Sequence, residues 1–285
     1  MKPNILQLIL LESFSNKNIP RIPEPMIMSD LENAKSFDEA GDIYGALVPI
    51  YLFAAEKISQ MTPYSGTVLD LGSGSGQFIF LLKKLRPDLK IICIELSSEM
   101  INIAISKLST NEDITNKEEI KFINSDMTQL QNIEYLKNTK IDTISSIFSI
   151  HHLPNELFLE KLFEEISFFI KRDDSKVFIF DHARPFSKKT PDIFPKIFTS
   201  NLSLIFQNDS KNSLIAAFTI DEILSKIKKF KLSITKAKRS KLIPLYQYFI
   251  LNNENAKVNF SKLNKKIALS FVTRTQYFQL RGLFL

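Results

Sequence analysis

The chain has 285 residues, 44% of them hydrophobic, and contains 24 phenylalanines, no tryptophan and a single cysteine. This length suits one large domain with additions, or one domain with a small cap. No run approaches the roughly 18 to 20 apolar residues of a membrane-spanning helix, the N-terminus lacks the cleavage pattern of a secretory signal, and Cys93 has no cysteine partner. We therefore expect a cytoplasmic protein with no membrane span.

Charge is distributed unevenly along the chain. The formal net charge is +6, yet residues 208–285 alone hold 12 lysines and 3 arginines against four acidic residues. Such asymmetry can mark an acidic partner, for example a nucleic acid. The favoured interpretation is a solvated, lysine-rich surface in a sequence biased towards lysine and isoleucine.

In chain order, the first element predicted is a helical N-terminal cap over residues 1–60, interrupted at Pro20, Pro23 and Pro25. From residue 68 to 181, short apolar runs alternate with segments of helical period, which is typical of βαβ units and a parallel sheet. Five runs are expected to be strands, at residues 67–71, 91–94, 120–123, 141–148 and 177–180.

The later elements are less regular. A helical insertion is expected at 189–216, followed by a helix that begins at the capping box of Thr219 and Glu222. Residues 232–238 and 245–251 are expected to form an antiparallel pair of strands. A C-terminal amphipathic helix is expected within 253–285, with apolar positions at Phe260, Leu263, Ile267 and Phe271. We expect three parts: the cap 1–60, a Rossmann-like α/β domain over 61–252 that includes the insertion, and the C-terminal helix.

The loop after the first strand is rich in glycine. Three of the seven glycines of the chain lie in the run from Gly72 to Gly76, and glycine permits tight turns and a close approach of backbone to a ligand. Glu95 ends the second strand, where a carboxylate can accept hydrogen bonds from both hydroxyls of a ribose. The dinucleotide fingerprint would require glycine in place of Gln77, and Asp70 fits a cationic amino-acid group better than a pyrophosphate.

These residues resemble the class I S-adenosylmethionine-dependent methyltransferases. Val68-Leu-Asp-Leu-Gly-Ser-Gly-Ser-Gly76 looks like their first motif, Ile94-Glu95-Leu-Ser97 their second and Asn124-Ser-Asp126-Met127 their third. Phe148-Ser-Ile-His-His-Leu and Phe180-Asp-His-Ala-Arg-Pro185 are similar to the fourth- and fifth-strand motifs. The resemblance covers roughly residues 40–250. It implies a seven-stranded, mostly parallel sheet with helices on both faces, and S-adenosyl-L-methionine over the carboxyl ends of the first four strands.

The resemblance also implies roles for single residues. Asp70 and the glycine loop would hold the amino-acid end of the cofactor, Glu95 the ribose, Asp126 the adenine together with Met127, and Phe148 the route to the sulfonium together with Ser146. The residues expected to bind the cofactor are Asp70, Gly72, Ser73, Gly74, Gly76, Glu95, Leu96, Asp126, Met127, Ser146 and Phe148.

All three histidines follow the fourth and fifth predicted strands, on the rim where the methyl acceptor should lie. His151 and His182 are the candidate catalytic residues, although His151 could also only shape the pocket, and we expect His152 to be structural. A base is needed only if the acceptor must lose a proton. No metal is expected, because His151 and His152 are adjacent instead of four apart on a helix, and the sequence has no HExxH motif or cysteine cluster.

Three functions remain open. The favoured one is a methyltransferase for a small-molecule acceptor, with an apolar lid formed by residues 1–50 and 189–216 and including Tyr44, Tyr51, Phe194, Phe198, Leu202 and Phe206. An RNA or protein methyltransferase is the second; a nucleic-acid partner is not favoured, since the fourth-strand motif lacks the Asn/Asp-Pro-Pro-aromatic pattern. A cofactor-binding protein without turnover is the third. The oligomeric state is left open.

Overall fold

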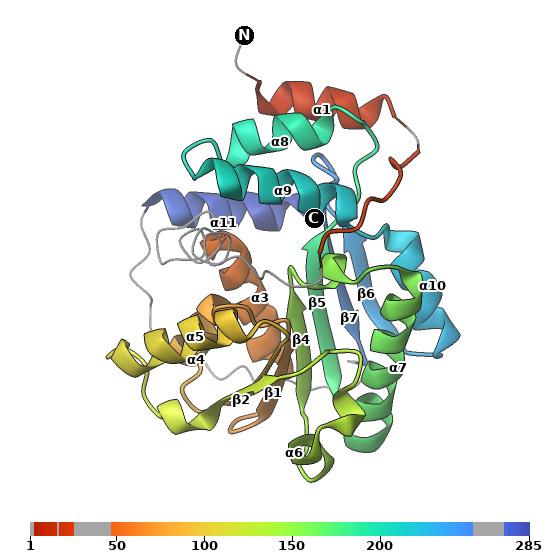
Figure 1. Ribbon diagram of the computed structural model, residues 1–285. Coiled ribbons are helices and arrows are strands. Elements are labelled where there is room, and N and C mark those ends of the chain that lie inside the picture. Colours follow the sequence, from red (N-terminus) through yellow and green to blue (C-terminus); the bar gives the residue numbers. More distant parts are fainter. Residues whose placement is uncertain (1–2, 16, 26–46, 253–270) are drawn as a thin grey trace.

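The computed structural model describes residues 3–15, 17–25, 47–252 and 271–285, and its centre is a seven-stranded sheet (Figure 1). The strand order is β3-β2-β1-β4-β5-β7-β6, and β7 runs antiparallel to both of its neighbours. The strands are β1 (Thr67–Leu71), β2 (Lys90–Glu95), β3 (Ile120–Asn124), β4 (Thr143–Ile147), β5 (Lys176–His182), β6 (Ile234–Arg239) and β7 (Tyr246–Leu251). The crossover between β1 and β4 creates a switch point, where open α/β sheets bind ligands at the carboxyl ends of strands.

Helices cover both faces of the sheet, because successive side chains of each strand point to opposite faces and both sets are apolar. One face carries α3 (Val48–Met61), α4 (Gln77–Leu85) and α5 (Ser98–Thr110), and the other carries α6 (Glu134–Lys137), α7 (Glu156–Asp173) and α10 (Ile220–Lys229). Within β1, Val68 packs into the first core and Leu69 into the second. Short 3-10 helices lie at Lys117–Glu119, Leu130–Asn132 and Ile150–His152.

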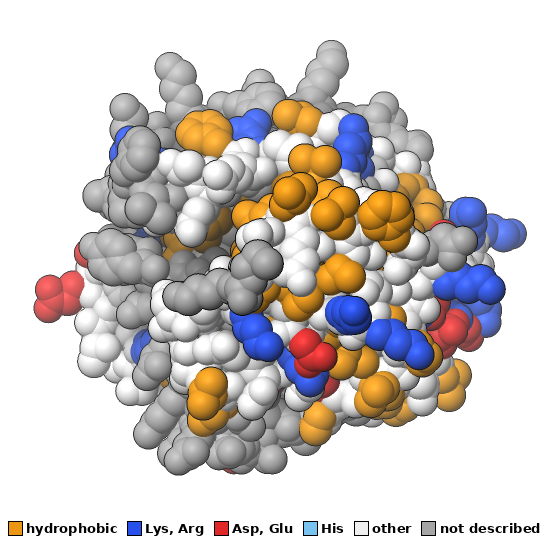
Figure 2. Space-filling view, turned by 90° about the horizontal axis from the view of Figure 1, so that it is seen from above, with side chains coloured by type: hydrophobic (Ala, Val, Ile, Leu, Met, Phe, Trp, Pro, Cys, Tyr) orange, Lys and Arg blue, Asp and Glu red, His pale blue; other side chains and the backbone are white. Residues whose placement is uncertain are grey.

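A further helical layer lies over the carboxyl ends of β4 and β5, at the top of Figure 1. It consists of α1 (Ile5–Ser13), α8 (Thr190–Phe198) and α9 (Leu204–Ala216), joined by a separate core that includes Leu8, Phe194 and Leu214. At its side, α11 (Phe271–Leu283) packs along α3. The outer face of this layer is partly apolar (Figure 2), with Leu6 of α1 and Phe14 directly after this helix exposed.

The expected Rossmann-like fold, with its antiparallel closing pair, is confirmed. Ser97 caps α5 through the amide of Met100, and both hydrogen bonds of the capping box between Thr219 and Glu222 are present. The fourth strand is shorter than expected and ends at Ile147, because Phe148 adopts a left-handed backbone conformation with φ of 54°.

Both ends of the chain were expected to be helical additions to the sheet. The last part of the predicted cap, α3, covers the sheet and contacts β4 and β5. The predicted apolar positions Phe260, Leu263 and Ile267 lie outside the described residues, as does Tyr44 of the predicted lid, and the C-terminal helix is described from Phe271 onward. In the described parts of the chain, no helix combines the length and apolar character needed to cross a membrane.

Candidate active site

The glycine loop turns back over the end of β2. Gly72, Gly74 and Gly76 all have positive φ, at 72°, 54° and 81°, which is a backbone region that glycine adopts without steric cost. The amides of Gly72 and Ser73 both donate to the carbonyl of Ile94, at 2.8 and 3.1 Å. A Cβ at Gly74 would meet no atom within 4 Å. The middle of the loop therefore presents bare backbone to open space.

Glu95 ties this loop to the next one. Its carboxylate accepts hydrogen bonds from the amide of Gly74 at 2.8 Å and from the amide of Ser97 at 2.9 Å. Burial raises the pKa of Glu95, and the two backbone hydrogen bonds oppose that shift because they favour the charged form. The carboxylate is thus fixed at the end of β2 and keeps lone pairs for a ligand.

Two further carboxylates stand at strand ends. Asp70 is buried in β1 and accepts a hydrogen bond from the hydroxyl of Ser145 at 2.5 Å. Burial raises the pKa of Asp70 to about 7. Beyond β3, one oxygen of Asp126 accepts from both the amide and the hydroxyl of Thr128, each at 2.8 Å. That turn sets the direction of the Asp126 side chain.

These side chains line a pocket at the carboxyl ends of β1, β2 and β3, which we call the loop pocket. Its free space is about 950 Å³, a volume that includes space open to solvent. Nine of the residues predicted to bind a cofactor line it, namely Asp70, Gly72, Ser73, Gly74, Glu95, Leu96, Asp126, Met127 and Phe148. Tyr51, Phe78, Ser149 and His152 line it as well, although the sequence pointed to a cofactor contact for none of them.

Gly76 and Ser146 are placed differently from the other predicted residues, since neither lines the loop pocket. Gly76 begins α4, and a Cβ there would lie 2.8 Å from the ring of Phe80. The hydroxyl of Ser146 is buried in β4 and lies 2.6 Å from the hydroxyl of Ser149. Both residues shape the surroundings of the pocket, and their contact with a cofactor stays a prediction.

A second pocket lies under the upper helices, and we call it the apolar pocket. Its free space is about 1630 Å³ on the same measure, and α1, α8, α9 and α11 all contribute to its walls. Three residues of the predicted lid, Phe194, Phe198 and Phe206, line it. Leu202 does not, and Tyr51 faces the loop pocket instead.

Phe148 lines both pockets. Its ring packs at right angles on Phe180, with centroids 5.4 Å apart, and lies 4.6 Å from the ring of His182. Non-glycine residues in the left-handed region are uncommon and cluster at functional sites. The turn at Phe148 directs this side chain to the boundary between the two pockets.

His151 and His182 both line the apolar pocket. Nδ1 of His151 lies 2.6 Å from Oδ1 of Asp181, and the amide of His151 donates to Oδ2 of the same carboxylate at 3.1 Å. Burial lowers the pKa of each histidine to about 3. Both rings are therefore neutral at physiological pH, and the Asp181 carboxylate favours the tautomer of His151 that carries its proton on Nδ1.

His182 has a different environment. Its ring stacks on Tyr246 with centroids 5.6 Å apart, and its Nδ1 is buried without a hydrogen-bond partner among the described residues. A buried polar nitrogen of this kind costs free energy unless a ligand or water pairs with it. His182 is thus a candidate contact for a polar atom of a ligand in the apolar pocket.

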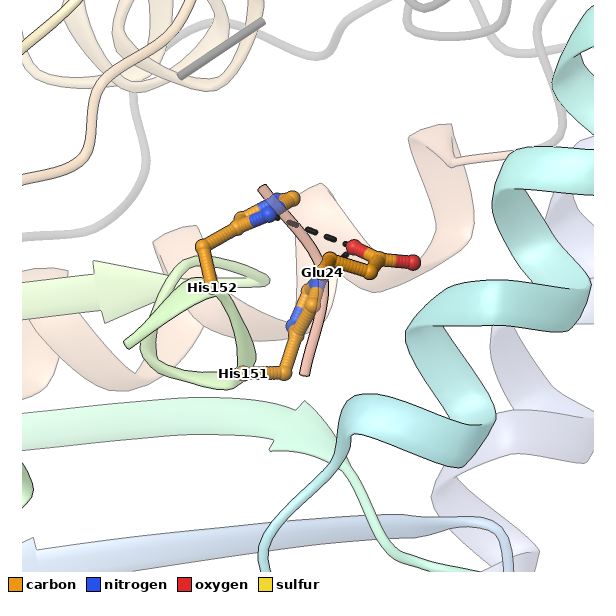
Figure 3. A group of neighbouring side chains, drawn as sticks. All are labelled: Glu24, His151 and His152. Carbon is orange, nitrogen blue, oxygen red and sulfur yellow. Dashed lines mark ion pairs between the residues drawn. The ribbon is translucent and has the colours of Figure 1, made fainter. Parts of the chain in front are cut away.

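The N-terminal segment at residues 17–25 reaches the histidines, a contact that no sequence pattern predicted. The guanidinium of Arg21 donates to the carbonyls of His151, Leu153, Pro154 and Ala216. These bonds hold the segment against the loop after β4 and the end of α9. Glu24 consequently lies beside His151 and His152 (Figure 3), with Oε2 3.2 Å from Nδ1 of His152.

Comparisons with known proteins agree with this geometry. The methyltransferase domain family matches residues 68–173. A tRNA N(3)-methylcytidine methyltransferase, trm141 of Schizosaccharomyces pombe, is 31% identical over 90 residues, which is 32% of this chain and 34% of that protein. The chain therefore spans about a third of the length of this curated relative.

Solved structures share the fold over most of the chain. A SAM-dependent methyltransferase from Aquifex aeolicus superposes with a TM-score of 0.52 at 16% identity, covering 78% of this chain and 97% of that one. The plantazolicin methyltransferase BamL, in complex with a triazolic desmethylPZN analogue and SAH, gives a TM-score of 0.56 at 16% identity, with coverages of 80% and 93%. Residues 68–173 thus match the methyltransferase domain family, and the sheet order and glycine loop agree with the class I S-adenosylmethionine-dependent type.

Proposed function

We propose that this protein transfers a methyl group from S-adenosyl-L-methionine to a small-molecule acceptor that binds in the apolar pocket. The observation that carries the proposal is the position of Phe148, whose side chain lines both pockets. A cofactor in the loop pocket and an acceptor in the apolar pocket would meet at this residue. The apolar pocket is lined mainly by hydrophobic and aromatic side chains, as small-molecule sites usually are.

The loop pocket fits the cofactor by the chemistry of its donors and acceptors. Asp70 supplies a carboxylate for the α-ammonium group, and the bare backbone at Gly74 leaves room beside it. Glu95 retains lone pairs for two ribose hydroxyls, and Asp126 can accept from the adenine amino group while Met127 packs on the ring. When bound, the cofactor supplies an electrophilic methyl carbon on a sulfonium.

The residues of the apolar pocket would align the acceptor and exclude water, which are the main requirements of an in-line displacement. The aromatic rings of Phe148, Phe194 and Tyr246 line this pocket and suit a dispersed positive charge without competing as nucleophiles. If the acceptor must lose a proton, neutral His182, neutral His151 and the carboxyl group of Asp209 are the candidate bases in the described lining. Asp181 would then stabilise His151 in its protonated form through the bond to Nδ1.

A nucleic-acid acceptor is the second candidate, favoured by the sequence similarity to the yeast tRNA methyltransferase and by the basic C-terminal region. Such an acceptor would have to bring a nucleobase out of its stack into the pocket. The sequence after β4, Phe148-Ser-Ile-His-His, offers no Asn/Asp-Pro-Pro-aromatic arrangement for an exocyclic base amine. We therefore place this acceptor class second.

One labelling experiment separates the candidates. Purified protein is incubated with methyl-deuterated S-adenosylmethionine and, separately, with a metabolite extract below about 1 kDa, total tRNA and total protein. Mass spectrometry then locates the label. We expect label in the metabolite fraction; label in tRNA or protein would overturn the small-molecule acceptor, and cofactor binding without label in any fraction would favour a protein without turnover. Asp70→Asn is the control for cofactor-dependent labelling.

A further inference from the structure

We propose that Glu24, His151 and His152 bind one divalent transition-metal ion, most suitably Zn²⁺, at the junction of the loop pocket and the apolar pocket. The proposal concerns ion binding, which can be tested without methyl transfer; an ion on Nε2 of His151 would leave His182 as the histidine available as a base. The sequence favoured no metal, because the two histidines are adjacent. The fold supplies the third ligand from a segment 127 positions earlier in the chain.

The ligand atoms are already close together. One nitrogen of each histidine and one oxygen of Glu24 lie within 4.8 Å of one another. Oε2 of Glu24 is 3.2 Å from Nδ1 of His152 and 4.0 Å from Nε2 of His151 (Figure 3). Zinc bonds of about 2.0 to 2.2 Å in a tetrahedron place ligand atoms roughly 3.4 Å apart. The cluster would therefore need to contract by about an ångström to close around an ion.

The orientation of His151 is the one that metal-bound histidines usually have. Its Nδ1 is 2.6 Å from the Asp181 carboxylate, which leaves the lone pair on Nε2, the nitrogen that faces Glu24. Metal-binding histidines commonly give their other N–H to a carboxylate or a carbonyl, and this bond fixes the tautomer and the direction of the ring. A ring N–H of His152 likewise donates to the backbone carbonyl of Pro25.

Glu24 lacks the partners that a buried carboxylate requires. Its side chain is 7% exposed, and Oε1 has no hydrogen-bond partner among the described residues. Arg21 is near, but its guanidinium donates to backbone carbonyls. The hydroxyl of Ser213 donates to Oε2 at 3.5 Å, which is long for a hydrogen bond from a hydroxyl group. An ion at Oε2 would give this buried carboxylate a positively charged partner.

Charge points in the same direction. Glu24 and Asp181 are both buried carboxylates next to His151, with side chains 7% and 1% exposed. A buried charge requires a compensating partner. A dication would balance the two carboxylates.

Three protein ligands leave a fourth tetrahedral position, which is the arrangement of catalytic zinc sites. His151 lines the apolar pocket and His152 the loop pocket. A ligand in the fourth position would lie where the two pockets meet. We infer that this position takes water, or an oxygen, nitrogen or sulfur atom of a molecule in the apolar pocket.

The test uses the full-length, untagged chain without any methyl donor. Metal is removed with a chelator, ZnCl₂ is titrated against a chromophoric chelator, and elemental analysis gives the stoichiometry. We expect one Zn²⁺ per chain, and Co²⁺ in its place should give the intense visible bands of a four-coordinate site. Absence of stoichiometric binding by the folded protein would overturn the proposal and leave Glu24 as a hydrogen-bond partner of His152.

Variants locate the ion. Glu24→Gln preserves size and should weaken Zn²⁺ binding at least tenfold, as should His152→Ala, while Asp181→Asn should weaken it by about 10- to 100-fold through His151. His182→Gln is the matched control, since it removes a buried histidine outside the cluster. Circular dichroism checks the fold of each variant. Equal affinity in Glu24→Gln and wild type would show that any bound ion lies elsewhere.

Discussion

The packing of the glycine loop gives a sharp prediction about stability in the absence of any ligand. Gly72 and Gly74 share a left-handed backbone, but an added methyl group meets different surroundings. At Gly72 it would lie 2.8 Å from Oγ of Ser149 and closer still to its Cβ, whereas at Gly74 it would meet no atom within 4 Å. The two alanine substitutions therefore share the backbone strain and differ in the collision.

The magnitudes follow from these contacts. A left-handed alanine costs about 1–2 kcal/mol, offset by about 0.4–1 kcal/mol because alanine restricts the unfolded chain. Gly74→Ala should thus lower the free energy of unfolding by about 0–1.6 kcal/mol. Overpacking at Gly72 adds about 1–3 kcal/mol, because Ser149 must move and its hydroxyl donates to the carbonyl of Leu71 at 2.7 Å. Gly72→Ala should therefore cost about 1–4.6 kcal/mol in total.

The assay is urea unfolding followed by far-ultraviolet circular dichroism, with no cofactor added. Ser149→Gly removes the Cβ that the new methyl group would meet, so the double variant should be less destabilised than the sum of the two single changes. If Gly72→Ala unfolds no more readily than Gly74→Ala, or if the double variant is simply additive, the contact between the loop and Ser149 is wrong.

Three further predictions concern the two pockets. Glu95→Gln should weaken binding of S-adenosylhomocysteine by about 1–3 kcal/mol in calorimetry, the scale of charge-assisted hydrogen bonds; an unchanged affinity in a folded variant would remove Glu95 from the ribose site. Burial raises the pKa of Asp70 to about 7, and the ionised form is the one that pairs with an ammonium group. Affinity should therefore rise up to about tenfold per pH unit from pH 5.5 to 7 and level off above, and Asp70→Asn should abolish the rise; a wild-type affinity independent of pH would contradict this. Phe194→Ala should lower methyl transfer while S-adenosylhomocysteine binds normally, and a parallel loss of both would mean that Phe194 only supports the fold.

The sheet and its glycine loop could be predicted because their signals are local. Apolar runs of strand length, Gly72 to Gly76, and the capping pair Thr219 and Glu222 each determine their own backbone within a few residues. The same locality placed Asp70 and Glu95 at strand ends, on one edge of the sheet. These positions needed no knowledge of how the helices pack.

The upper half of the site could not be predicted, since it depends on contacts between distant segments. Nothing near Glu24 indicates that it lies beside His152, because Arg21 places it there through carbonyls that any sequence would offer. Ser149 supports Gly72 from 77 positions away. His152 was expected to be structural, yet it lines the loop pocket, while the neighbouring His151 lines the apolar pocket.

The central claim is that cofactor and acceptor occupy separate pockets that meet at Phe148. A crystal structure of the complex with S-adenosylhomocysteine tests it most directly. We predict electron density in the loop pocket, with the ribose hydroxyls against Glu95, the ammonium group near Asp70 and the sulfur atom facing Phe148 and the apolar pocket. Density for the ligand outside the loop pocket, or a sulfur atom separated from the apolar pocket by closed protein, would contradict the account.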